Sequence, residues 1–170
     1  VQRITQGNGI TLRTILTEQI LDFGLAWTTE VVQKILVSPP SDTAALFSKE
    51  KTGQVFKVMR LRSVEGKPVV LETAYVSAEL CPGLALEDLR SGSVFELMVE
   101  KNGIPIARTA DSFAVTNLEQ NEAKLLRRTT GDTALLMDRI VYTSSDRVAA
   151  FIRVLNASDE YRVTVQSFSA

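Results

Sequence analysis

The chain of 170 residues contains no histidine and one cysteine, Cys81. Without histidine it has no Ser-His-Asp triad, no Cys-His pair, no histidine-ligated zinc and no imidazole to transfer protons near neutral pH. A single cysteine allows neither an intrachain disulfide nor a cysteine-rich metal site. We therefore expect no metal, no cofactor and no histidine-based catalysis.

The chain also lacks an excess of either charge: 19 basic and 20 acidic residues give a formal net charge of −1. A dedicated nucleic-acid-binding domain usually has a clear basic excess, so this balance argues against one. No apolar run approaches the roughly 18–20 residues that cross a bilayer, and no signal peptide is recognisable. We expect one cytoplasmic domain, which at this length needs no metal or disulfide to fold.

Prolines and glycines divide the chain into segments whose patterns alternate between strand and helix. Helices are expected over 41–47, 93–101 and 119–128, the last with Asn117 as its cap. Several strands follow one another without a crossover helix, and such short links make neighbours antiparallel. The sequence therefore predicts an α+β domain with a mostly antiparallel sheet. The expected strands are 27–37, 55–63, 68–77, 106–115, 135–143, 148–155 and 161–168.

The most informative segment is a hairpin from Val55 to Tyr75. We expect a three-residue loop, 64–66, with glycine at the position that needs a positive φ. This loop puts Arg60, Arg62 and Glu72 on one face, whereas a two-residue loop would move Glu72 to the other. The face expected to pack in the core carries Met59, Leu61, Val69, Leu71 and Tyr75.

Arg60 and Arg62 project in parallel because they are two residues apart on a strand. Guanidinium groups bind phosphate or carboxylate through paired hydrogen bonds, so the pair is a candidate anion site. The alternative is a solvated strand face with a surface ion pair to Glu72. Spacing alone favours this alternative, since any half-exposed strand alternates in this way.

Ser93-Val-Phe-Glu96 has the pattern of a capping box, with serine at the helix cap and glutamate three positions later. A plain helix cap is the simpler interpretation. A helix start also attracts anions, so Ser93 and the arginine face could hold one ligand together if they converge.

These residues resemble a known family. Arg60-Leu-Arg62, Glu65-Gly-Lys-Pro68 and Glu72-Thr-Ala-Tyr75 are similar to the central signature of the UTRA domain. This is the effector-binding domain of the HutC subfamily of GntR-type bacterial transcription regulators. The resemblance covers nearly the whole chain and depends on the order of many weak motifs. The further matches are Cys81-Pro-Gly-Leu84, Ser93-Val-Phe95, Asn102-Gly-Ile104, Glu122 to Leu126 and Ala134-Leu-Leu136 followed by Arg139.

The resemblance implies a chorismate-lyase-like fold, a mostly antiparallel sheet flanked by short helices, and a homodimer. It implies that residues 10–170 form the ligand-binding domain and that 1–9 end a linker from a winged helix-turn-helix domain absent from this chain. It also implies an effector pocket that uses Arg60, Arg62, Glu72 and Ser93.

Three positions depart from the family pattern. Phe95 replaces a frequent tyrosine, Ala150 replaces a glutamate, and Asn156 stands where tyrosine is frequent. Each change removes a polar contact or a ring from the distal part of the implied pocket. We therefore expect a small anionic effector, an organic acid or a phosphorylated metabolite, in a more apolar pocket than an amino-sugar phosphate needs.

Two other functions stay open at this stage. A chorismate-lyase-like enzyme could use the arginines and the glutamate to bind a dicarboxylate, although fold alone does not transfer activity. A ligand-free dimerisation module could associate through apolar edge strands. We expect a sensor that modulates DNA binding by the missing domain, and no enzyme activity.

Overall fold

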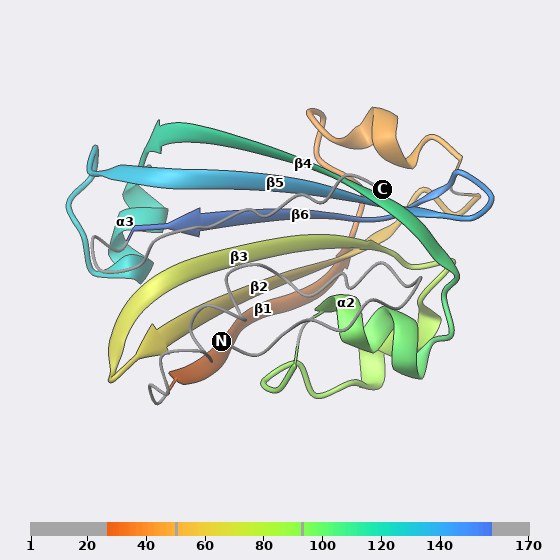
Figure 1. Cartoon of the computed structure of the whole chain (residues 1–170), viewed down its shortest axis with the longest axis horizontal. Coiled ribbons are helices and arrows are strands. Elements are labelled where there is room, and N and C mark those ends of the chain that lie inside the picture. The colour runs from red at the N-terminus through yellow and green to blue at the C-terminus, as the bar shows by residue number, and fades with distance from the viewer. Residues whose placement is uncertain (1–26, 50, 93, 158–170) are drawn as a thin grey trace, which may run out of the picture.

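The computed structural model describes residues 27–49, 51–92 and 94–157. Its six strands form one antiparallel sheet in the order β1-β2-β3-β6-β5-β4 (Figure 1). This confirms the expected α+β class; the strand expected over 161–168 lies outside the described residues. The strands are β1 Trp27–Val37, β2 Val55–Val64, β3 Lys67–Ser77, β4 Ile106–Asn117, β5 Thr133–Thr143 and β6 Val148–Asn156.

The helical elements are short, and one differs from expectation. The expected helix over 93–101 is present from Val94 to Lys101, but its first turn is α-helical and the rest is π-helical. Nowhere in the described ranges is there a helix long and apolar enough to span a membrane. The helical elements are η1 Ala44–Phe47, η2 Pro82–Leu86, α2 Val94–Glu96, η3 Leu97–Lys101 and α3 Gln120–Leu126.

Helix α3 begins with a capping box at Glu119, two residues after the cap that the sequence predicted. Glu119 is the cap, and its backbone N–H donates to the Glu122 carboxylate at 2.8 Å. Asn117, the expected cap, ends strand β4, and its amide donates to the Gly131 carbonyl at 2.7 Å. The prediction of Asn117 was wrong because the strand extends through that residue.

The hairpin between β2 and β3 has a two-residue turn, and the three-residue loop was wrong. Glu65 and Gly66 both have positive φ, 49° and 78°, as a type I′ turn requires. A bulge then adds one residue at Val69, so that Arg62 lies opposite Val70 and Arg60 opposite Glu72. Because the extra residue offsets the shorter turn, the two arginines and Glu72 keep the shared face that was predicted.

Other segments pack on both faces of the central strands of the sheet. The arginine face carries the even-numbered residues 56–62 of β2, 70–76 of β3 and 150–156 of β6. The segment 81–104 packs on this face and forms the largest apolar cluster with it. On the opposite face α3 packs at one end of the sheet and η1 at the other (Figure 1). The expectation of a half-exposed arginine face was wrong because a distant segment covers it.

Candidate functional site

The candidate site is centred on Glu72, whose carboxylate lies between two arginines. Arg60 donates from Nε to Oε1 at 3.0 Å and also from Nη2 to the same oxygen. Arg62 donates from Nη2 to Oε2 at 3.2 Å. All three side chains are buried: Arg60 is 0% exposed, Arg62 3% and Glu72 4%. The interpretation as a surface ion pair is therefore wrong, and the three predicted residues form one buried charge cluster.

Arg60 connects the sheet to the segment that covers it. Its Nη1 donates to the carbonyl of Leu89 at 3.2 Å and to that of Gly92 at 3.0 Å. The guanidinium thus holds a carboxylate on one edge and two loop carbonyls on the other. This arrangement positions the 89–92 turn over the arginine face.

In the cluster, ion pairing opposes the cost of burying charge. Burial opposes ionisation of Glu72, but attraction and hydrogen bonding from Arg60 and Arg62 outweigh it and lower the pKa of Glu72. Burial lowers the pKa of Arg62, and repulsion from Arg60 adds to this, while Glu72 and Glu96 act in the opposite direction. Attraction between the two buried arginines and the buried carboxylate thus offsets part of the cost of removing their water.

Arg62 has an aromatic neighbour and lies in a cross-strand row that reaches Asn156. Its guanidinium carbon lies 5.3 Å from the ring centre of Trp27, within cation–π range. Val70 of β3 pairs with Arg62 on one side and with Asn156 of β6 on the other. Asn156 is buried and lies two strand spacings, about 10 Å, from Arg62. The structure therefore puts this predicted residue on the same face and in the same row as the arginine.

The other predicted residues lie farther from the charge cluster or outside the described ranges. Phe95 is buried in the apolar cluster between the covering segment and the sheet. Ala150 is on the same face but pairs with Val76, four residues along β3 from Glu72, which corresponds to about 13 Å. Ser93 lies outside the described residues.

Two groups that interact with the arginines were not predicted from the sequence as part of the site: the backbone of Gly92 and the carboxylate of Glu96. Gly92 supplies a carbonyl to Arg60, and Glu96 raises the pKa of Arg62. The capping-box pattern placed Glu96 at a helix start. No local pattern relates that helix to strand β2, which lies more than thirty residues earlier.

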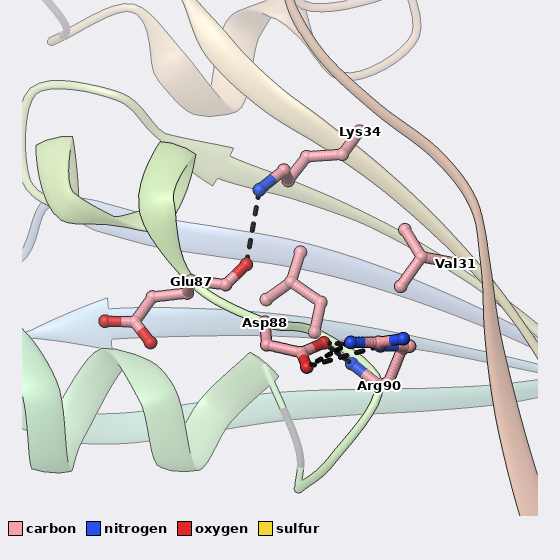
Figure 2. Close-up of a pocket in the computed structure, with 6 residues that line it drawn as sticks. Val31, Lys34, Glu87, Asp88 and Arg90 are labelled. Carbon is pink, nitrogen blue, oxygen red and sulfur yellow. Dashed lines mark hydrogen bonds and ion pairs between the residues drawn. The ribbon is translucent and has the colours of Figure 1, made fainter.

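A separate hollow of about 210 Å³ lies outside the cluster, at the edge strand β1 (Figure 2). Lys34 spans it by donating to the carbonyls of Ala85 and Glu87 at 2.6 and 3.2 Å. Asp88 and Arg90 form an exposed ion pair there, and this pairing lowers the pKa of Asp88 to about 2. Typical ligand pockets enclose about 300–1,000 Å³, so this hollow is small for an effector. Its lining residues are Val31, Lys34, Glu87, Asp88, Leu89 and Arg90.

Among the residues that the structure describes, no group of three or more histidine, cysteine, aspartate or glutamate side chains could hold a metal ion. The donor set of the candidate site is instead cationic. Its chemistry is recognition of negative charge.

Comparison with known proteins identifies transcription regulators as relatives of this chain. The family model of the UTRA domain matches residues 23–162. The HTH-type transcriptional repressor NagR of Bacillus subtilis is 22% identical over 148 residues, 87% of this chain and 60% of the repressor. The HTH-type transcriptional regulator GmuR of the same organism is 34% identical over 80 residues, 47% of this chain and 33% of the regulator.

Solved structures share the fold. The effector domain of PhnF from Mycobacterium smegmatis superposes with a TM-score of 0.78 at 23% identity, covering 91% of this chain and 94% of that domain. The chain spans less than two thirds of the length of NagR and about one third of GmuR.

Proposed function

The chain belongs to the UTRA domain family, the effector-binding domains of GntR-family transcription regulators, and from this premise we propose that it senses a small anionic metabolite. The observation that carries the proposal is the buried Arg60–Glu72–Arg62 cluster, with two cations on one carboxylate. An organic acid or a phosphorylated metabolite would bring negative charge to these two arginines. Burial strengthens such an interaction because little water screens it.

We assign the ligand contact to Arg62 and a positioning role to Arg60. Arg60 is bound on both edges, by Glu72 and by the carbonyls of Leu89 and Gly92. Arg62 lies next to the ring of Trp27, and Asn156 lies on the same face two strands away. Ser93 is a further proposed contact.

The apolar environment supports an effector with a small non-polar body. Phe95 and Ala150 belong to the cluster under the covering segment, and neither offers a hydroxyl or carboxylate to a sugar. Side chains of this kind select against a polyhydroxylated ligand, because its hydroxyl groups would lose water without gaining partners. The proposed effector is therefore less polar than an amino-sugar phosphate.

The wider role of the protein follows from the family. We propose that this domain forms a homodimer in the cytoplasm and that a winged helix-turn-helix domain precedes it through a linker ending at residues 1–9. An effector changes DNA binding only if it has different affinities for two arrangements of the regulator; a tenfold difference is about 1.4 kcal/mol. A sensing role requires no turnover, and we expect no release of pyruvate from chorismate.

Isothermal titration calorimetry against a panel of organic acids and phosphorylated metabolites tests the site. We expect Arg62→Lys to weaken binding of a panel member at least about tenfold, because lysine cannot reproduce a bidentate, stacked contact. Arg108→Lys is the matched control, since Arg108 is an exposed arginine paired with Asp146. Its affinity should equal that of the native chain.

The same titration distinguishes the site from the hollow at β1. If Arg90→Lys weakens binding and Arg62→Lys does not, the effector binds at the hollow and the assigned site is wrong. Pyruvate formation from chorismate would instead support the enzyme alternative.

A further inference from the structure

We propose that the hollow at β1 is the entrance through which an effector reaches the buried arginines, and that Lys34 is the latch that keeps this entrance closed. The inference rests on the proposed function of the site. It adds the route of the ligand and the contact that controls it.

The arginine cluster needs an entrance because the folded chain closes it. Arg60, Arg62 and Glu72 are all buried, with at most 4% of each residue exposed. The segment 81–104 packs over them and forms an apolar cluster with the sheet. An anion from solvent therefore reaches the guanidinium groups only after part of the fold moves aside.

The hollow lies directly outside the charge cluster (Figure 2). Its wall includes Val31, which pairs with Arg60 across β1 and β2. Leu89 forms another part of the wall, and the carbonyl of Leu89 accepts from Nη1 of Arg60 at 3.2 Å. Two neighbours of Arg60 thus border the hollow, one from the edge strand and one from the covering segment.

The wall on the covering segment is an arch, residues 85–88, held between two buried leucines. Leu84 and Leu89 are 0% and 1% exposed, whereas Leu86 within the arch is 92% exposed. The other arch residues are exposed or half-buried. A stretch that buries so few side chains has low local stability, so it opens more readily than the sheet beneath it.

Lys34 holds this arch from the edge strand. It pairs with Val58 of β2, so it lies on the arginine face of the sheet. Its Nζ donates to the carbonyls of Ala85 and Glu87 at 2.6 and 3.2 Å (Figure 2). Lys34 is exposed, so water can replace these carbonyls as partners when the arch lifts.

The inner end of the segment is held differently. Arg60 donates to the carbonyls of Leu89 and Gly92, and Arg60 is fully buried. Breaking these bonds would leave buried groups without partners, which costs more than hydrating an exposed ammonium group. The segment therefore opens first at Lys34, and the opening begins at the hollow.

Hydrogen exchange followed by mass spectrometry tests the latch. The amides of Leu84 and Glu87 donate within the segment, so their exchange reports its opening. We expect Lys34→Met to raise the exchange rate over 84–90 at least about threefold, because losing two charge-assisted hydrogen bonds favours the open form.

Lys49→Met is the matched control for this measurement. Nζ of Lys49 also donates to a distant backbone carbonyl, that of Asp146 at 3.1 Å, and this bond is exposed as well. The substitution makes the same chemical change away from the arch. It should leave the exchange over 84–90 as in the native chain.

Rapid-mixing fluorescence tests the entrance, with inorganic phosphate as the probe. Trp27 is the single tryptophan, and its ring centre lies 5.3 Å from the guanidinium carbon of Arg62, so its emission reports an anion at the site. We expect Lys34→Met to bind and release phosphate at least about threefold faster than Arg90→Met. Arg90→Met removes the same charge from the same hollow but leaves the Lys34 bonds in place, so it controls for electrostatic attraction at the entrance.

Unchanged exchange in Lys34→Met, or an equal rise in Lys49→Met, overturns the latch. Faster exchange with phosphate rates equal to those of Arg90→Met means that the arch opens but is not the entrance, and the inference fails. Absence of phosphate binding to the native chain overturns it too, because an entrance to two arginines must admit this anion. The proposed function is decided separately, by the effect of Arg62→Lys on binding of the metabolite panel.

Discussion

Arg60→Met tests whether the charge cluster holds the domain together. Methionine keeps much of the side-chain length but removes both hydrogen bonds to Glu72 and those to the carbonyls of Leu89 and Gly92. Arg60 is 0% exposed, so water cannot replace these partners. Breaking a buried ion pair from one side costs about 3–5 kcal/mol. A buried carbonyl that loses its donor adds about 1–3 kcal/mol.

We therefore expect Arg60→Met to lower the free energy of unfolding by at least about 3 kcal/mol, out of the roughly 5–15 kcal/mol typical of a domain. Urea titration followed by circular dichroism measures it, with the midpoint falling and the slope unchanged if the folded state is otherwise intact. Arg108→Met, in an exposed ion pair, is the control and should change stability by less than about 1 kcal/mol. A loss below about 1 kcal/mol for Arg60→Met would refute the reasoning.

A triple replacement shows whether charge is the reason for that loss. Arg60→Met combined with Arg62→Met and Glu72→Leu removes all three charges at once. Replacing a buried ionic triad by apolar residues of similar size is often neutral or stabilising, because no charge is left without a partner. We expect the triple variant to be more stable than Arg60→Met alone. A triple variant less stable than the single one would mean that the arginines act mainly through packing.

Three further predictions follow from the described contacts. The pKa of Glu72 is lowered in the folded state, so its stabilising contribution is fully present above the ordinary value of 4.5 and is lost as pH falls through the folded pKa. In urea titrations between pH 7 and pH 3, Glu72→Gln should therefore lose less stability than the native chain does. Gly66→Ala and Gly92→Ala should each lower the melting temperature, since both glycines have positive φ, and Gly83→Ala, where φ is not positive, is the comparison. Leu126→Ala in α3, 1% exposed, should cost about 2–5 kcal/mol in the same melts, and a loss below about 1 kcal/mol would show that α3 is not packed as described.

The local features of the fold were largely predictable. The β-rich composition and the Pro and Gly positions located six strands within a few residues of their observed bounds. Antiparallel pairing followed from the short links between them. The errors lay where two local effects compete: the turn at Glu65–Gly66 is shorter than expected, and the bulge at Val69 compensates for it. Neither feature is visible from alternation alone, because both change the register by one residue.

The candidate site was only half predictable, for a physical reason. Arg60 and Arg62 are two residues apart on one strand, so the sequence by itself determined that they share a face. Glu72 joins them because the bulge at Val69 offsets the shorter turn. Burial is different: it depends on the segment 81–104, which covers the arginine face only after the chain has folded back on itself. Tertiary structure therefore decided that Arg60 binds two loop carbonyls, that Glu96 acts on Arg62, and that the cluster is a buried charge centre instead of a solvated ion pair.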